Sequence, residues 1–469
     1  MNRQQAVDAA REMLQARAFE APRLDGIDAA MKPWGEDRAL ATLGLSGVNQ
    51  AVKPAITRLA RKSQTNFLPL ILDIFGQALK VTNYMTGGDE PRTAAPWQWW
   101  QRNKLDARQT GIHRTALQYG VSYATVLPSL TSGDDVSPAA YVRGVSPRQM
   151  TALYGERLEW DPRKGGPVDD DWPIMALEMK GPMIRLYDET AVHFIGVKNV
   201  PQSALGWTQH TYITSGNFEY IEGRGHGVGV CPVVRYQDRM LLDGEEYFGI
   251  IEPLLSIQER IDETIFAGLV NQYYAAFRQR WITGWVPQSE EQALRQAVTD
   301  TWTFKDSTVK VGQFEPSDGK AYQEAQAGAI RDLSAIAQTP PQSMGVAGIS
   351  NLSEAALAGL EAGRERKASE MEASLGESHE QMLRTCAHIT GDTDAAADFG
   401  SEVKWAAASA RTFAQTIDGL GKLATMLGVP DEVLWEDIPD WTASKVKRAI
   451  SARLAAGDVQ DVPLPDDGE

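Results

Sequence analysis

Two helical patterns that enclose a short insert constrain the fold of this chain more than any other feature. The first covers 246–280, where Pro253 suits the first turn of a helix and apolar residues follow at steps of three and four. The second covers 321–338, and the segment between them, 281–320, has a mixed pattern rich in Trp. We expect a helical hairpin that carries a small domain at its tip, which is unusual in a compact enzyme.

The segment after the hairpin, 339–351, contains no charged residue. It ends where Asn351 can cap a helix, and Glu354, three residues later, can complete a capping box. The helix predicted to follow, 353–389, keeps its apolar residues in helical register. Glycines inside it predict a bend or close packing against a neighbouring element; they are Gly359, Gly363 and Gly376.

The rest of the chain combines helical and β-like patterns. A helix predicted at the N-terminus gives way to a loop containing Pro22 and Gly26. β-like segments continue from 121 to about 240. The other predicted helices are 4–18, two pieces of 49–80 on either side of Pro69, one from about 95 to Gly120, and several within 400–458 that begin at Trp405. The fold class is therefore predicted to be α+β and mostly α-helical.

The charge balance limits the partners of the protein. Among 469 residues, 46 are Lys or Arg and 62 are Asp or Glu, which gives a net charge of −16. Proteins that grip nucleic acid usually carry a basic face, so this chain either avoids DNA or meets it loosely. Its length suggests roughly three domains. The composition is otherwise that of an ordinary globular protein.

The cysteines and the apolar runs indicate a soluble, non-secreted protein. Cys231 and Cys386 lie far apart in apolar or helical surroundings, and we expect both to be buried as small hydrophobic residues. The N-terminus lacks the apolar core of a signal peptide. The longest apolar run, 67–75, contains an aspartate and is too short to span a bilayer.

No motif of a catalytic or cofactor site stands out. The six histidines form no HExxH pair and have no carboxylate at metal-ligand spacing, so we expect structural or surface roles and no metal or cofactor. The glycines of 223–229 precede a strand pattern, whereas a dinucleotide site needs them before a helix. The sequence contains no P-loop and no G-x-S-x-G elbow.

Two alternatives stay open. Acidic turns at 169–171 and 245–246 could hold Mg²⁺ for work on nucleic acid, although charge runs in turns are usually solvated surface. The aromatic cluster of 97–100 could stack on bases, but helical packing explains it at least as well. The chain could therefore be a metal-dependent nucleic-acid enzyme, and an adaptor of a virion is a third possibility.

Three collinear segments carry a resemblance to a known family. They are Trp97-Gln-Trp-Trp-Gln-Arg-Asn103-Lys-Leu-Asp106 with Ala116-Leu-Gln-Tyr-Gly120-Val-Ser-Tyr123, then Cys231-Pro-Val-Val234 with 250–264, and finally Ala335-Ile-Ala-Gln-Thr339-Pro-Pro341 with Asn351-Leu-Ser-Glu-Ala-Ala-Leu357. In this order the chain resembles the SPP1-type portal proteins of actinobacterial phages. The resemblance spans about 95–390, and near the first helix Lys32-Pro-Trp-Gly35 stands where that family has a Tyr-Tyr-x-Gly pattern.

The resemblance implies a portal fold and a division of the chain. It implies a wing at 1–245, a stem at 246–280 and 321–338, a clip at 281–320, a tunnel loop at 339–351, a long kinked wing helix at 352–395, and a helical crown with an acidic tail at 396–469. It also implies a ring, a dodecamer, at one capsid vertex of a tailed phage. Its partners would be passing double-stranded DNA, the terminase large subunit, the head-completion adaptor, and the major capsid and scaffold proteins, with assembly in the host cytoplasm.

The resemblance also implies the residues that meet DNA. A duplex must slide through a portal in both directions, and phosphate contacts from Lys or Arg would slow it. The tunnel-loop residues expected to face DNA are uncharged: Gln342, Ser343, Met344, Val346, Ile349, Ser350 and Asn351. Near the clip, four bases could touch the DNA backbone or could simply be exposed surface charges: Arg278, Arg280, Lys305 and Lys310.

Overall fold

The computed structural model forms two compact units, Met1–Ala406 and Ala407–Glu469, and each is described by itself. Both helices and strands are present and helices predominate, in agreement with the predicted class. The structure describes residues 1–32, 53–87, 92–130, 138–155, 172–198, 217–239, 247–276, 280–284, 308–313, 319–345, 354–406, 413–435, 438, 441 and 443–460.

The first helix, α1 (Arg3–Met31), is twice as long as the sequence predicts. The prediction of a loop at Pro22 and Gly26 is wrong, because the helix continues through both residues. A proline inside a helix costs about 3 kcal/mol. Burial on both sides of it offsets this cost: Leu14 packs on a sheet, and Leu24 and Ile27 enter the main core.

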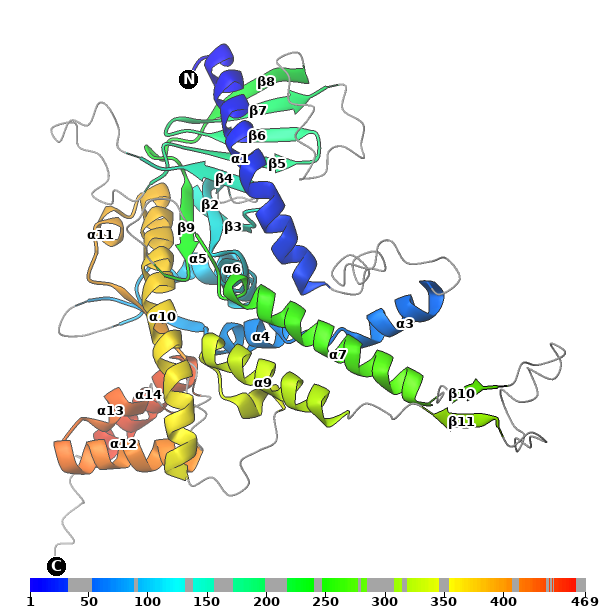
Figure 1. The fold of residues 1–469 in the computed structure, drawn as a ribbon. Coiled ribbons are helices and arrows are strands. Elements are labelled where there is room, and N and C mark those ends of the chain that lie inside the picture. Colours follow the sequence, from blue (N-terminus) through cyan, green and yellow to red (C-terminus); the bar gives the residue numbers. More distant parts are fainter. Residues whose placement is uncertain are drawn as a thin grey trace, which may run out of the picture. The chain divides into compact units, whose positions relative to one another are not determined.

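The sheet beneath α1 is an antiparallel meander of five strands in the order β4-β5-β6-β7-β8. One face of α1, including Ala10 and Met13, packs on Leu177, Ile184 and Leu186 of this sheet. Figure 1 shows α1 lying along it. The strands are β4 (Met150–Leu153), β5 (Met175–Lys180), β6 (Met183–Tyr187), β7 (Ala191–Val197) and β8 (Phe218–Gly225).

A second antiparallel sheet has the order β3-β2-β9. Its strands are β2 (Val121–Leu130), β3 (Pro138–Val145) and β9 (Val233–Gln237). The helix α6 (Leu105–Tyr119) leads into β2 through Gly120, which has φ +87°, and a Cβ there would lie 2.7 Å from the backbone nitrogen of Phe248. This turn therefore requires a glycine, and the predicted helix stop is confirmed.

The longest helix, α10 (Glu354–Thr390), contacts all three strands of this second sheet. Ser374 and Ser378 of α10 donate hydrogen bonds to the carbonyls of Gln237 and Arg235 on β9, at 2.9 and 2.8 Å. Between these two serines, a Cβ on Gly376 would lie 3.3 Å from the side chain of Val403, so this glycine permits close packing, as predicted.

Val403 belongs to a strand that the sequence does not reveal. The prediction of a helix beginning at Trp405 is wrong, because β12 (Glu402–Trp405) pairs antiparallel with β1 (Val81–Met85). Trp405 contributes its ring to the buried region around His379, 6.3 Å away. Because β12 pairs with a strand that lies far from it in the sequence, the pairing leaves no local sequence pattern.

Helices α3 (Lys53–Ser63), α4 (Leu68–Ala78) and α5 (Trp97–Arg102) lie between α1 and α6, in agreement with the predicted pieces. In α5, Trp100 is fully buried and stacks on Trp97 with ring centroids 5.0 Å apart. Trp99 is buried as well, so the aromatic cluster packs mostly in the core, as the packing explanation predicts. Cys231 and Cys386 are free and buried, as predicted.

A chain of polar side chains crosses the core of the first unit. His113 of α6 and His379 of α10 are both fully buried, and their Nε2 atoms lie 2.7 Å apart. The Nδ1 of His113 lies 3.1 Å from the carbonyl of Leu79, and Tyr236 of β9 bonds to the Nδ1 of His379 at 3.1 Å. This series of hydrogen-bonded side chains thus links α6, α10 and the second sheet.

The second unit contains α12 (Phe413–Leu427), α13 (Asp431–Leu434) and α14 (Ala443–Gln460), in agreement with the helical pattern predicted there. Leu434 and Val446 are buried, and several apolar side chains of α12 and α13 are well exposed, including Met426, Leu427 and Val433. The acidic tail beyond Gln460 lies outside the described residues.

Candidate functional site

The helical hairpin predicted from the sequence is present. Its helices are α7 (Leu255–Ala276), preceded by the short η4 (Glu252–Leu254) with Pro253, and α9 (Lys320–Ala337). Arg260 of α7 pairs with Asp332 of α9 at 2.6 Å, and a Cβ on Gly268 would lie 3.5 Å from Tyr322. From the first contact to the second, residue numbers rise on α7 and fall on α9, so the two helices are antiparallel. Figure 1 shows them side by side.

Two side chains of α7 fix the base of the hairpin to the turn between α3 and α4. Gln258 accepts from the amide of Phe67 at 2.9 Å and donates to the carbonyl of Thr65 at 2.9 Å. Asp262 accepts from the amide of Thr65 at 3.0 Å. At the start of α4, the side chain of Asn66 accepts from the amide of Leu68 at 3.1 Å, and Gln258 of α7 supplies the acceptor for the preceding amide, that of Phe67. Burial raises the pKa of Asp262 to about 6.

The far part of the hairpin leaves the core. Ile261 is fully buried, whereas the apolar side chains Ile265, Phe266, Leu269 and Val270 of α7 are only partly covered within this chain. Beyond it, β10 (Arg280–Thr283) pairs antiparallel with β11 (Lys310–Gln313), which agrees with the mixed pattern predicted for the insert.

The bases expected near this insert are only partly described. Arg280 lies opposite Gln313 at one end of the ladder, and Lys310 lies opposite Thr283 at the other end with its side chain exposed. Arg278 and Lys305 lie outside the described residues. The structure therefore places two of the four bases on one small ladder.

The uncharged segment begins where α9 ends. Gln338 caps α9 in a left-handed conformation with φ 57°, and Thr339 and Pro340 are buried. A 3₁₀ turn, η5 (Pro341–Met344), follows and ends at Gly345, whose φ is +77°. A left-handed residue other than glycine is uncommon, and here two left-handed residues enclose the first part of the segment.

The expected DNA-facing residues divide into three groups. Ser343 is exposed and Gln342 is half-buried. Met344 is 4% exposed and packs in the main core, so its side chain anchors the segment and does not lie on a surface. The others, Val346, Ile349, Ser350 and Asn351, lie outside the described residues, as does the predicted capping box of α10.

An open groove of about 590 Å³ lies between the end of α9 and the first half of α10. Gly359 and Gly363 line it from α10, and a Cβ on Gly359 would meet nothing within 4 Å. Three buried polar groups next to it have no hydrogen-bond partner among the described residues: the hydroxyls of Ser334 and Thr339 and the side-chain amide of Gln342.

The charges beside this groove are buried and perturbed. Lys367 of α10 donates to the carbonyl of Ala337 at 3.2 Å, and burial lowers the pKa of its ammonium to about 8. Burial raises the pKa of Asp238 to about 6, opposed by the guanidinium of Arg239 3.2 Å away. The hydrogen bond of Lys367 joins α10 to the end of α9.

In the described part of the chain, no group of three or more His, Cys, Asp or Glu side chains could hold a metal ion. The acidic turns 169–171 and 245–246 lie outside the described residues. The glycines of 223–229 precede β9, as predicted. None of the described helices is long and apolar enough to cross a membrane.

Comparisons with known proteins point in one direction. The family model described as "Phage portal protein, SPP1 Gp6-like" matches residues 46–454. The portal protein of Mycobacterium phage D29 is 23% identical over 368 residues, covering 76% of this chain and 71% of the relative. That of Mycobacterium phage L5 is 23% identical over 370 residues, with the same coverage of 76% and 71%.

Among solved structures, the chain is similar to one from the neck of a native gene transfer agent particle computed with C12 symmetry. The TM-score is 0.45 and the identity is 12%, and the match covers 89% of this chain and 94% of the other. It is also similar to one from the virion of a native gene transfer agent, with a TM-score of 0.42 and 13% identity, covering 87% and 99%. By the family match over most of its length, the chain belongs to the SPP1 Gp6-like family of phage portal proteins.

Proposed function

We propose that the chain forms a closed ring, a dodecamer, at one capsid vertex of a tailed phage, and that double-stranded DNA passes through the ring during packaging and ejection. The observation that carries this proposal is the uncharged segment after Ala337, which joins the returning helix of an outgoing hairpin to the longest helix. In a chain with a net charge of −16, such a segment offers phosphate neither attraction nor repulsion.

Partly covered apolar side chains support the ring. Ile265, Phe266, Leu269 and Val270 of α7 are incompletely covered within one copy. A ring arises when one surface of a subunit binds a different surface of the next and the rotation closes. In that arrangement α7 and α9 of neighbouring copies cover one another and enclose a channel.

The regions take the roles that the family implies. We assign the wing to 1–245 and 352–395, the stem to 246–280 and 321–338, the clip to 281–320 and the tunnel loop to 339–351. We move the start of the crown from 396 to 407 and extend the wing to 406, because β12 pairs with β1 in the first unit. Met344 is left out of the DNA-facing residues because it is buried. Arg280 and Lys310, with Arg278 and Lys305, are proposed to touch the DNA backbone near the clip.

The partners follow from these roles. The terminase large subunit would dock at the clip during packaging, and the head-completion adaptor would replace it. The scaffold and major capsid proteins would contact the wing, with assembly in the host cytoplasm and the finished ring in the virion. The family is structural, and we propose that the chain has no catalytic site and needs no cofactor.

The experiment that tests this proposal is negative-stain electron microscopy of the purified protein, with top views classified by rotational symmetry. We expect rings with a central hole slightly wider than a DNA duplex. Monomers or dimers at high protein concentration would contradict self-assembly, and rings without such a hole would favour a virion adaptor. Incubation with duplex DNA and Mg²⁺ tests the remaining alternative, since cleavage would reveal a nuclease.

A further inference from the structure

The strand β3 has one edge that no described strand covers. It pairs with β2 and with no other strand in the part of the chain that the structure describes. The side chain of Asn103 bonds to the outer edge: it donates to the carbonyl of Ala140 at 3.0 Å and accepts from the amide of Val142 at 2.9 Å. Backbone groups of a strand face the same edge at every second residue, so the N–H and C=O of Gly144 face the outer edge too.

The ladder between β2 and β3 agrees with this assignment. Val126 lies opposite Val142, and its amide donates to the carbonyl of Pro232 at 2.9 Å, away from β3. Val126 and Val142 therefore do not bond to each other, and neither do Ala124 and Gly144, the next pair but one along the ladder. Outside the sheet, no described residue bonds to the backbone of Gly144. The described chain thus leaves one donor and one acceptor of this edge open to a further strand.

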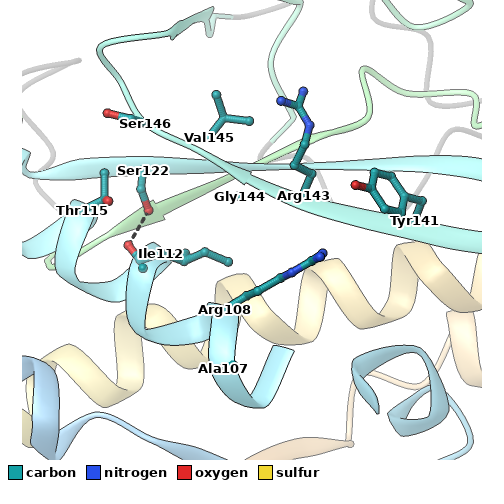
Figure 2. Close-up of a pocket in the computed structure, with 11 residues that line it drawn as sticks. Ala107, Arg108, Ile112, Thr115, Ser122, Tyr141, Arg143, Gly144, Val145 and Ser146 are labelled. Carbon is teal, nitrogen blue, oxygen red and sulfur yellow. Dashed lines mark hydrogen bonds between the residues drawn. The ribbon is translucent and has the colours of Figure 1, made fainter. Parts of the chain in front are cut away.

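A groove accompanies the open part of the edge. It has a volume of about 540 Å³ and is lined by β3 and α6 (Figure 2). Its α6 side consists of small residues one turn apart, Ala107, Gly111 and Thr115, and a Cβ on Gly111 would meet nothing within 4 Å. The backbone of an extended peptide can therefore reach the edge of β3 without a clash against α6.

The groove is basic although the chain as a whole is acidic. Arg108 lines it, is exposed and forms no ion pair with another described residue, and Figure 2 shows its side chain extending beneath β3. The second arginine, Arg143, is already paired with Glu178 at 2.6 Å. None of the described residues that line the groove is acidic, and the acid in the first turn of α6, Asp106, accepts from the indole of Trp100 at 2.9 Å. With a net charge of −16, the chain repels an acidic partner in general and attracts it here.

We propose that the outer edge of β3 binds an extended, acidic segment of a partner protein, which adds to the three-stranded sheet as a further strand. The backbone of the segment bonds to Gly144, and its side chains alternate between the two faces of the sheet. Those on the side of α6 lie over Gly111, where an acidic side chain pairs with Arg108. Because Asn103 already bonds to the edge before Gly144, the ladder is short, and the charge of the groove selects the partner.

The test is hydrogen–deuterium exchange of the full chain, read at the Gly144 amide. The probe is a blocked six-residue peptide of alternating Glu and Val, added up to millimolar concentration. We expect fast exchange without the peptide, and exchange about tenfold slower when the peptide is at ten times its Kd, because the amide then donates to the added strand. A peptide of alternating Lys and Val is the matched control and should give no protection.

Each of three results would overturn the proposal. If the Glu peptide does not slow the exchange, the edge does not bind such a segment. If the amide already exchanges slowly without peptide, another part of the protein covers the edge. Equal protection by the Lys peptide would show that the groove does not select acidic partners.

Two pairs of variants test the groove itself. R108E should abolish the protection, whereas R108K should retain it at low salt. G111F fills the groove from α6 and should also abolish the protection, whereas G111A adds only a Cβ in open space and should retain it. Circular dichroism checks that all four variants are folded. Protection that persists in R108E or in G111F would contradict the proposed site, and none of these outcomes bears on ring formation, which is read separately by microscopy.

Discussion

His113 and His379 share a single proton between their Nε2 atoms, 2.7 Å apart in the core of the first unit. The carbonyl of Leu79 can only accept, so His113 carries its proton on Nδ1 and its Nε2 is an acceptor. His379 then donates from Nε2 and accepts from the hydroxyl of Tyr236 at Nδ1. Every ring nitrogen is satisfied while both rings are neutral, and a second proton on either ring would disrupt the chain.

The first prediction concerns the stability of the protein at low pH. Burial lowers the pKa of His113 to about 4 and holds that of His379 well below its usual value. Between pH 6.5 and 4 the unfolded chain binds protons that the folded chain does not, so these groups make folding less favourable as the pH falls through that window, by up to about 3 kcal/mol for His113. Urea unfolding at pH 7.0, 5.5 and 4.5 measures it. H113N keeps a donor toward Leu79 and should show a flatter pH dependence in this window, and an unchanged slope would contradict the assignment.

Asp238 should act in the opposite sense. Its pKa is raised to about 6 by burial, so the folded chain holds a proton that the unfolded chain loses above pH 4, and this contribution to stability disappears as the pH rises to 6. D238N should therefore stabilise the protein at pH 8, by at most about 3 kcal/mol, with no gain at pH 3.5. Thermal unfolding at the two pH values tests this, with D394N, at an exposed position, as the control. A gain of equal size at both pH values would refute the cause.

Gln258 should be required to fix the base of the hairpin to the turn between α3 and α4. Q258A removes the acceptor of the Phe67 amide and the donor to Thr65, so we expect a loss of about 2–3 kcal/mol and faster amide exchange in 64–67. E259A changes an exposed neighbour on the same helix and should be close to neutral. Equal effects of the two variants would show that α7 does not hold this turn through Gln258.

Glycines at two helix positions should respond oppositely to alanine. G120A forces a Cβ into the backbone of Phe248 at a φ of +87°, so it should destabilise by more than about 2 kcal/mol. G26A lies inside α1 with nothing within 4 Å of the new Cβ and should stabilise by about 0.5–1 kcal/mol. The midpoint of urea unfolding measures both changes, and a tolerated G120A would contradict the described turn.

A charge in the uncharged segment should make the channel retain DNA. Ser343 is exposed, and S343K would bring one lysine per subunit to the proposed channel wall. We expect rings of S343K to retain linear duplex DNA at 50 mM salt and to release it at 200 mM, because phosphate contacts are strongly salt-dependent. S343N is the neutral control and should behave like the wild type. If S343K, like S343N, fails to retain DNA at 50 mM salt, Ser343 does not lie close to the DNA.

Local patterns foretold most of the elements, and long-range contacts account for the failures. Apolar periodicity predicted α7, α9 and α10, and Gly120 marked the end of α6, because these signals lie within a few neighbouring residues. The extension of α1 past Pro22 depends on burial against distant strands, and β12 depends on β1, more than 300 residues earlier in the chain. The support of α4 by Gln258 is equally invisible, since an isolated Gln on a helix face has no distinguishing pattern.

The candidate site was predictable in composition and not in geometry. The absence of charge in 339–351 can be read directly from the sequence. The burial of Met344 could not be, because an apolar residue in a loop can face either the core or a partner. The unsatisfied polar groups of Ser334, Thr339 and Gln342 come together only when α9 ends beside α10.

The length of α10 has a mechanical consequence. At 1.5 Å per residue, its 37 residues extend over roughly 55 Å. One end adjoins the uncharged segment, while the middle is bonded to β9 through Ser374 and Ser378 and the later turns to His113 through His379. A force on the first turns is therefore carried along a stiff rod to an anchored sheet, so strain applied at the segment is felt several nanometres away.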